Sequence, residues 1–251
     1  MKKTMFTRKL PAIVLALAAG QLAVASGAGA QQELGKGLLS GLFAPPPAPP
    51  APAAPALPPA APAAAAAAPA AASTPEQVEQ KLAALKYDVG PADGNIDAQA
   101  RSAIIAFQKV GHLPRTGELT PEVAAQILAT NSPPGPLAPN GEPHRVEVSL
   151  AHQVLFLYQG GNLTKILPVS TGTSATPTPT GTFRFYRSDP GWHTSRLGRL
   201  HNAQYFVGGY AIHGSNSVPA EPASHGCIRI PMSASEWFPS AVGRGVQVII
   251  V

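Results

Sequence analysis

The stretch 224–230, Ser-His-Gly-Cys-Ile-Arg-Ile, contains Cys227, the only cysteine among 251 residues. A lone thiol has no partner within the chain for a disulfide, so a bridging role is excluded by counting. Another histidine, His213, stands 14 residues upstream in the stretch Ile-His-Gly at 212–214. A free thiol with imidazoles close in the sequence is typical of a cysteine nucleophile.

The residues beside Cys227 fit acyl transfer. A nearby cation or imidazole lowers a thiol pKa from about 8.5 to roughly 3.5–7.5, so we expect a stabilised thiolate here. His213 comes from a separate segment and is expected to be the proton donor and acceptor, whereas His225 lies two residues from the thiol and supports the site. Gly226 leaves room beside the thiol, and we expect the backbone N–H groups of Gly226 and Cys227 to bind an oxyanion.

A third group usually orients the imidazole of a Cys-His pair. Acidic residues are scarce here, because no Asp follows Asp189 and only two Glu do. Glu221 stays open as an orienting carboxylate, but a backbone carbonyl near Gly214 or Ser215 is the predicted partner of His213.

Arg229 should share a face with Cys227 on an extended segment and could bind a substrate carboxylate bidentately. An ordinary surface or ion-paired arginine is the alternative. Residues 144–251 hold eight Lys and Arg against four Asp and Glu, a net charge of +4. This excess suits an acidic substrate.

Three other interpretations compete with the nucleophile. Cys227 could be a small buried hydrophobe, and His213 a core histidine with satisfied hydrogen bonds. His213, His225 and Cys227 are also legitimate zinc ligands. The scarcity of acidic residues argues against a zinc peptidase, so we expect no metal and no cofactor. His193 and His201 fall in a polar, Arg-rich segment and are predicted to be surface residues in a loop.

The N-terminus carries an export signal over residues 1–30. Four basic residues precede a short apolar run at 12–19, and Ala28-Gly29-Ala30 supplies a small-x-small cleavage pattern. We therefore expect secretion to the periplasm or cell wall. Removing residues 1–30 takes away four of the 18 Lys and Arg and none of the 13 Asp and Glu, which leaves a net charge of +1. That balance argues against a nucleic-acid partner, and no protein partner is predicted.

Composition divides the remaining chain. Residues 31–73 are predicted to be a disordered Pro/Ala-rich linker, because residues 44–72 contain 11 prolines among 29. Fully extended as polyproline II, this stretch could reach ~90 Å. It could be a spacer that spans the cell wall, or a low-complexity linker with no particular length requirement. Residues 74–130 form a predicted helical domain, 131–143 a second linker rich in Pro, and 144–251 a C-terminal domain.

Helix signals recur in 74–130. Thr74 and Gln77 fit a capping box, Asp97 is a plausible N-cap, and Thr120 precedes a proline at a helix start. In 144–251 the pattern changes: residues 145–150 alternate in polarity, and the apolar run 154–158 precedes a Gly-Gly-Asn turn. No long helical stripe is evident there. The predicted fold is a small all-α three-helix module followed by a predominantly β domain, sandwich- or barrel-like.

The ordered pattern of His213-Gly214, then Ser-His-Gly-Cys-Ile-Arg at 224–229, resembles the L,D-transpeptidase family with a YkuD-type catalytic domain. Supporting residues are Leu-Phe-Leu-Tyr at 155–158, Val-Ser-Thr-Gly at 169–172 and Thr-Pro-Thr-Gly-Thr-Phe at 178–183. The resemblance implies attack by Cys227 on a peptidoglycan stem tetrapeptide, release of D-Ala, a thioester acyl-enzyme and transfer to an acceptor amine. It further implies substrate contacts for Ser224, Gly214 and Arg229, and covalent inhibition by carbapenem β-lactams.

The helical segment resembles a peptidoglycan-binding domain, carried by Gly-Pro-Ala-Asp-Gly at 90–94, Phe107-Gln108 and Gly-His-Leu at 111–113. That resemblance implies a glycan partner, whereas a helical spacer that binds nothing is the alternative. For the whole chain, an L,D-carboxypeptidase or D-amino-acid exchange enzyme would use the same residues. A non-catalytic wall-binding scaffold is the alternative from a different class. The stretch 191–209 is short for a lid on the acceptor side of the site.

Overall fold

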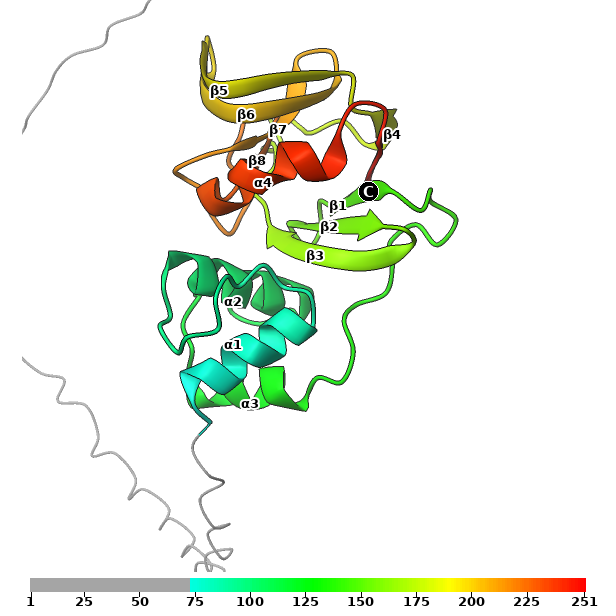
Figure 1. The fold of residues 1–251 in the computed structure, drawn as a ribbon. Coiled ribbons are helices and arrows are strands. Elements are labelled where there is room, and N and C mark those ends of the chain that lie inside the picture. The colour runs from blue at the N-terminus through cyan, green and yellow to red at the C-terminus, as the bar shows by residue number, and fades with distance from the viewer. Residues whose placement is uncertain (1–72) are drawn as a thin grey trace, which may run out of the picture. The chain divides into compact units, whose positions relative to one another are not determined.

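The computed structural model describes residues 73–251, shown in colour in Figure 1. The predicted signal peptide and all but the last residue of the linker predicted at 31–73 lie outside the described residues. In the described part of the chain, no helix has the length and apolar character needed to cross a membrane.

Three short helices follow: α1 (Pro75–Ala84), α2 (Ala98–Val110) and α3 (Pro121–Ala129). Their starts confirm the predicted caps. Thr74 and Gln77 form both bonds of a capping box, and the Asp97 carboxylate accepts from the first N–H groups of α2. Thr120 caps α3, with Pro121 at its first position. Each cap satisfies N–H groups that a helix start leaves without intrahelical partners.

The β domain contains two sheets, which confirms the predicted fold class. The first has the order β3 (Asn162–Pro168), β2 (Val154–Gln159), β1 (Arg145–Ser149), β9 (Gln247–Ile250) and β4 (Gly181–Arg184). The second has the order β5 (Arg187–Ser195), β6 (Gly198–Val207), β7 (Tyr210–Gly214) and β8 (Ile228–Ile230). Pairing is antiparallel except for β1–β9 and β7–β8.

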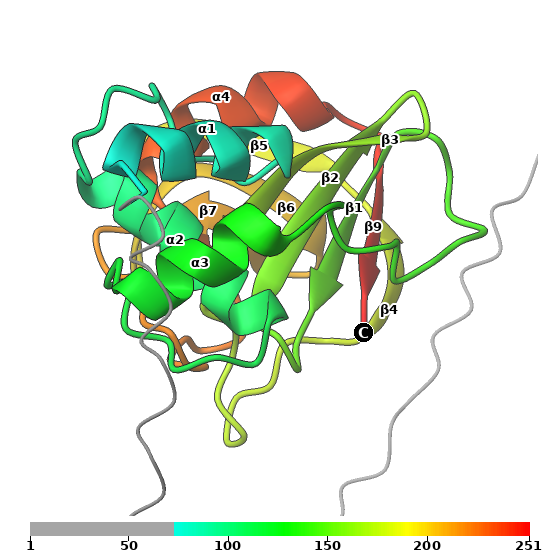
Figure 2. The ribbon, with the colours of Figure 1, turned by 90° about the horizontal axis from the view of Figure 1, so that it is seen from below.

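The apolar run 154–158 is explained by burial on both faces of β2. Leu155 and Leu157 pack into the core between the two sheets, while Val154, Phe156 and Tyr158 pack against the helices. A strand covered on both faces needs no polar alternation, which is why the run is continuous. Figures 1 and 2 show the helical module beside β2 and β3, with α2 nearest to these strands.

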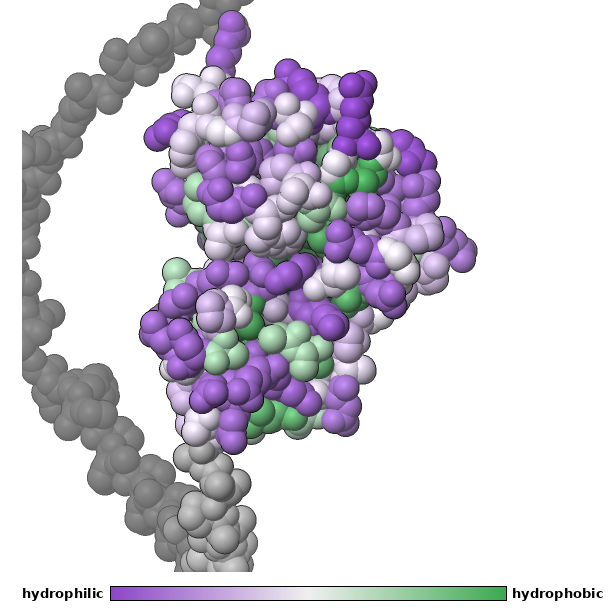
Figure 3. All heavy atoms as spheres, in the orientation of Figure 1, coloured by the Kyte–Doolittle hydropathy of each residue, from purple (hydrophilic) through white to green (hydrophobic). Residues whose placement is uncertain are grey.

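The helical module does not have a separate core. Its apolar residues form one buried cluster with those of β2 and with Ile166 of β3. Tyr87 makes a β-bridge with Ile166, and the Asp88 carboxylate pairs with Lys165 Nζ at 2.7 Å. Polar side chains cover most of the face seen in Figure 3, where apolar spheres form only small patches. The apolar contact between module and sheet is therefore buried in one folded unit.

Two segments of the β domain differ from the sequence-based expectation. A helix, α4 (Met232–Val242), follows β8 where no helix was expected. Prolines at both 231 and 239 hide its pattern, but Ala234, Phe238 and Val242 are spaced by four and are buried in the core between the sheets. The predicted polar loop around His193 and His201 is instead the β5–β6 hairpin.

His193 is exposed, as expected, but the surface prediction for His201 is wrong. His201 is buried on β6, where its Nδ1 lies 2.9 Å from Ser235 Oγ of α4. Because α4 was not anticipated, the partner that buries this ring could not be anticipated either. The hairpin extends beyond His201 to a tip at 195–198, next to the cavity described below.

Candidate active site

The parallel pairing of β7 with β8 brings the two candidate catalytic segments together. Ile212 lies opposite Ile228, and His213 lies opposite Arg229. Since side chains alternate across a strand, Ile212 and Ile228 enter the core while His213 and Arg229 share the other face. Cys227 immediately precedes β8 and lines the same cavity as His213 and Arg229.

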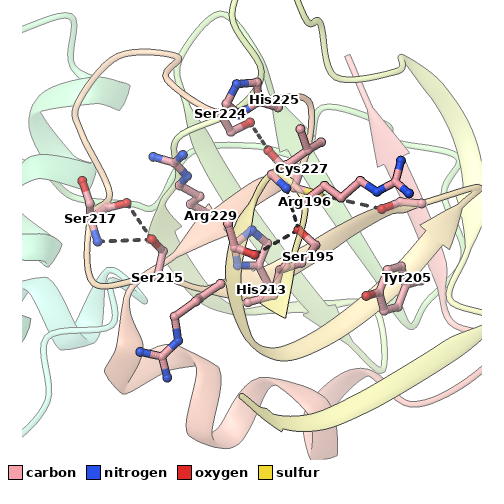
Figure 4. Close-up of a pocket in the computed structure, with 15 residues that line it drawn as sticks. Ser195, Arg196, Tyr205, His213, Ser215, Ser217, Ser224, His225, Cys227 and Arg229 are labelled. Carbon is pink, nitrogen blue, oxygen red and sulfur yellow. Dashed lines mark hydrogen bonds between the residues drawn. The ribbon is translucent and has the colours of Figure 1, made fainter. Parts of the chain in front are cut away.

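This cavity has a volume of about 610 Å³. Figure 4 shows His213, Ser224, His225, Cys227 and Arg229 around this cavity, together with Ser195 and Arg196 from the tip of the β5–β6 hairpin. The lining residues are Ser195, Arg196, Leu197, Gly198, Arg199, Leu200, Tyr205, Gly209, His213, Ser215, Ser217, Ser224, His225, Cys227 and Arg229. The structure thus brings together five of the seven predicted site residues. The hairpin residues at 195–200 escaped the prediction, and their only sequence signal was two arginines beside the Gly of a turn.

The His213 imidazole is oriented by a backbone carbonyl, as predicted. His213 Nδ1 lies 2.9 Å from the carbonyl oxygen of Gly214. Because a carbonyl can only accept, Nδ1 must carry a proton, and in the neutral ring Nε2 is left with a lone pair. His213 is 5% exposed, so this tautomer is held in a buried setting. The ring is therefore prepared to accept a proton at Nε2.

The protonation directions differ from the expected thiolate. Burial raises the pKa of the Cys227 thiol, and the opposing effects of the Ala211 backbone N–H and of Arg229 are smaller. Burial also lowers the pKa of His213; Arg229 adds to this, whereas the hydrogen bond to Gly214 opposes it. Both directions favour a neutral thiol and a neutral imidazole, which line the same cavity. The arrangement suits proton transfer from sulfur to Nε2 during attack rather than a preformed ion pair.

Ser224 organises the turn before Cys227. It is buried, accepts a hydrogen bond from the Gly226 N–H at 3.0 Å and donates from Oγ to the Cys227 carbonyl. The Gly226 N–H is thus already engaged, which corrects its expected role as an oxyanion donor. The Cys227 N–H is the remaining donor of the predicted pair.

At positions 226 and 214 the structure requires glycine because a larger residue would not fit. Gly226 has φ +106°, and a Cβ there would lie 2.4 Å from the Tyr210 ring. A Cβ at Gly214 would lie 2.3 Å from Ser235 Oγ. The Cα of Gly214 therefore packs against α4, and Gly214 is not among the residues that line the cavity. Its contribution to the site is the carbonyl that orients His213.

A threonine outside the predicted site also braces the turn. Thr178 Oγ1 donates to the Gly226 carbonyl at 2.9 Å and accepts from the Gly172 N–H at 2.8 Å. Thr178 and Gly172 both belong to stretches that supported the family resemblance. Their sequence signal was present, but nothing in it indicated contact with the catalytic turn.

The cavity is cationic. Its lining includes Arg196, Arg199 and Arg229 but no acidic residue. Among the residues that the structure describes, Arg229 is in no ion pair, whereas the Arg199 guanidinium stacks on Trp192 at 4.3 Å. Exposed His225 lies on the cavity wall beside Ser224. Such a lining favours ligands that carry carboxylates.

Within residues 73–251, no group of three or more His, Cys, Asp and Glu side chains is placed to hold a metal ion. The zinc interpretation of His213, His225 and Cys227 therefore lacks a ligand set.

Replacing Arg229 with glutamine should make the Cys227 thiol less reactive. The guanidinium lowers the thiol pKa, so its loss raises that pKa further and reduces the thiolate fraction at a fixed pH below it. We expect iodoacetamide alkylation at pH 8 to slow by roughly two- to ten-fold. Arg244→Gln, at an exposed arginine outside the cavity, is the matched control. An unchanged alkylation profile in Arg229→Gln would contradict the electrostatic role.

Comparison with known proteins agrees with this geometry. Residues 143–250 match the family model "L,D-transpeptidase catalytic domain", and residues 72–127 match "Putative peptidoglycan binding domain". The chain is 31% identical over 125 residues to "Putative L,D-transpeptidase YkuD" of Bacillus licheniformis, covering 47% of this chain and 71% of that protein.

A crystal structure of the L,D-transpeptidase from Xylanimonas cellulosilytica, residues 123–326, has 32% identity and a TM-score of 0.65. The match covers 70% of this chain and 92% of that chain. The fold and these matches define a class of enzymes with a β catalytic domain. In this chain that domain follows a helical module that matches the model of a peptidoglycan-binding domain. The chain belongs to the L,D-transpeptidase family.

Proposed function

We propose that this protein is an exported L,D-transpeptidase that cross-links peptidoglycan through a thioester on Cys227. The observation that carries the proposal is the cavity shared by Cys227 and His213, in which Nδ1 of His213 is fixed and Nε2 is left to exchange a proton. Family membership supplies the substrate class. The cationic lining supports it, because stem peptides carry carboxylates.

The first half-reaction proceeds from the neutral pair. Cys227 Sγ attacks the carbonyl between the L-centre of diaminopimelate and the terminal D-Ala, while His213 Nε2 takes the thiol proton. The Cys227 N–H is the proposed donor to the oxyanion. The C–N bond then breaks, and the imidazolium returns the proton to the amine of departing D-Ala. The products are free D-Ala and a thioester on Cys227.

The second half-reaction reverses these roles. An acceptor amine, which we propose to be the side-chain amine of another diaminopimelate, attacks the thioester and gives a proton to His213. The C–S bond breaks, the thiolate recovers that proton, and a new amide links the two stems. Arg229 is proposed to bind donor carboxylate, with His225 supporting at the cavity wall.

The N-terminal segments complete the proposal. The signal at 1–30 would deliver the enzyme to the periplasm or cell wall, and the Pro/Ala-rich stretch would separate it from the point of export. The helical module is proposed to contact glycan, supported by its family-model match. Carbapenem β-lactams are proposed to acylate Cys227, because their strained carbonyl takes the place of the scissile amide.

Mass spectrometry of a tetrapeptide muropeptide incubated with the enzyme tests the reaction. We expect free D-Ala and a cross-linked dimer, and a stable mass adduct when the enzyme is treated with imipenem. A tripeptide product without dimer would indicate a carboxypeptidase, and incorporation of an added D-amino acid would indicate exchange. An unchanged muropeptide together with an unmodified enzyme would support the wall-binding scaffold and reject the proposed activity.

A further inference from the structure

A lysine of the helical module is buried inside the β domain. Lys109, on α2, is 0% exposed. Its Nζ donates to the backbone carbonyls of Gln153 at 3.1 Å and Val169 at 2.8 Å. Burying an amine costs free energy unless its N–H groups make hydrogen bonds. The two contacts to these carbonyls offset that cost for Lys109. Both acceptors belong to the β domain.

The segment that Lys109 holds also holds the catalytic stretch. After Val169, Ser170 exchanges two backbone hydrogen bonds with Arg229, at 3.1 and 3.0 Å. The next carbonyl, that of Thr171, accepts from the N–H of Ser224 at 3.0 Å. Residues 169–171 therefore lie between Lys109 and both ends of the stretch 224–229. A shift of this segment would move Cys227 relative to His213.

Gln153 provides a second connection to the same segment. Its side chain donates to Thr171 Oγ1 at 2.7 Å and accepts from the Thr171 N–H at 2.9 Å. Gln153 also has φ +59°, a conformation that costs energy for a residue with a side chain and is kept only when its surroundings fix it. The hydrogen bond from Lys109 to the Gln153 carbonyl is part of those surroundings.

Arg115 of the same module contacts the approach to the catalytic turn. Its Nη1 donates to the Ala220 carbonyl at 3.2 Å, and its Nη2 lies 3.4 Å from the Ala151 carbonyl. Ala220 precedes Ser224 by four residues, in the loop that enters the turn. Two side chains from the module thus bind backbone on two sides of the catalytic stretch.

We propose that Lys109 and Arg115 are positioning residues for the stretch 224–229, which makes the helical module part of the acyl-transfer unit and not only a wall-targeting domain. This inference rests on the proposed function for its kinetic consequence. Its structural consequence, the placement of Cys227, can be measured independently of turnover.

The hydrogen-bond count at Lys109 fits a neutral amine. Burial lowers the pKa of Lys109 to about 7, with a further lowering by Arg115 and an opposing effect of Glu221. A neutral amine has two N–H donors, and the structure offers two carbonyl acceptors. Methionine at this position would fill similar volume but leave both carbonyls without these donors.

The test uses full-length Lys109→Met, Lys109→Arg and Arg115→Met. Lys81→Met is the matched control, because Lys81 lies on α1 of the same module and makes no side-chain hydrogen bond or ion pair among the described residues. Each variant is assayed well below its melting temperature for kcat and KM with tetrapeptide, and for the pH profile of iodoacetamide alkylation at Cys227. The alkylation measurement does not depend on which reaction the enzyme catalyses.

We expect Lys109→Met to lower kcat by about 10- to 100-fold with little change in KM, the scale of a small misplacement of reacting groups. Alkylation at pH 7 should accelerate, because a displaced turn exposes the thiol and relieves the burial that raises its pKa. Lys109→Arg should not restore kcat, because a guanidinium is larger and stays charged in a buried site that offers only two carbonyls. Lys81→Met should match the wild type.

A folded Lys109→Met with wild-type kcat and alkylation profile would overturn the inference. If Lys109→Met does not fold, Arg115→Met decides: its side chain is only half-buried, and wild-type behaviour there would be equally contradictory. If the wild type does not turn over tetrapeptide but Lys109→Met alters alkylation, the positioning inference stands and the proposed function fails.

Discussion

Cys227→Ala is expected to lose at least ~10⁴-fold in transpeptidation, because the variant has no atom that can form the thioester. The fold should tolerate the change, since Cys227 is partly exposed on the cavity wall and alanine introduces no new volume. Formation of dimer from tetrapeptide, followed by mass spectrometry, measures the loss. The imipenem adduct should disappear in the same variant.

The Cys227→Ser variant distinguishes the nucleophilicity of the side chain from its size and shape. Serine keeps a proton-bearing atom at nearly the same position, but an alcohol is a far weaker nucleophile than a thiol. We expect the serine variant to fold like the wild type and to remain nearly inactive. Wild-type turnover by Cys227→Ala would remove the nucleophile assignment and with it the thioester mechanism.

His213→Gln is expected to lower kcat by about 10²- to 10⁴-fold, the usual contribution of a positioned acid-base group. The loss follows from the neutral pair: with burial raising the thiol pKa, the sulfur needs a base at Nε2 when it attacks. In the wild type, kcat/KM should fall at low pH as His213 becomes protonated. Because burial lowers the His213 pKa, this limb should lie below the ordinary histidine value of about 6.5.

The His213 variant has a diagnostic pH response. At high pH the thiol ionises without help, so the difference in imipenem acylation between wild type and His213→Gln should narrow. His193→Gln is the control, since His193 is exposed on β5 and does not line the cavity. A constant difference at all pH values would point to a role for His213 other than taking the thiol proton.

The sequence predicted which residues line the candidate site better than it predicted how the fold brings them together. Residue types and order identified Cys227, His213 and the carbonyl partner of the imidazole, because these depend on local chemistry. The parallel pairing of β7 with β8 could not be predicted, since it joins strands separated by residues 215–227 and is set by long-range packing. The direction of the Cys227 pKa shift also differs from the expectation, because it depends on burial that no local pattern records.

The fold predictions were correct for elements whose sequence signal is local, such as a helix cap. The caps at Thr74, Asp97 and Thr120 are local, and each was found. The helix α4 was missed because prolines obscured a short apolar stripe that only the surrounding sheets make meaningful. Lys109 could not be recognised as buried, because a lysine on a helix normally faces water and its two acceptors are 44 and 60 residues away.

The apolar cluster common to the helices and to β2 has a consequence for how such enzymes can recombine. A module with its own complete core can be exchanged between proteins as a cassette. Here Tyr87 and Phe107 lose their covering if β2 and β3 are replaced by unrelated strands, and Phe156 is bared if the helices are removed. A chimaera of this protein should therefore transfer the helices together with the β2–β3 hairpin, because either part alone would expose apolar residues of the shared cluster.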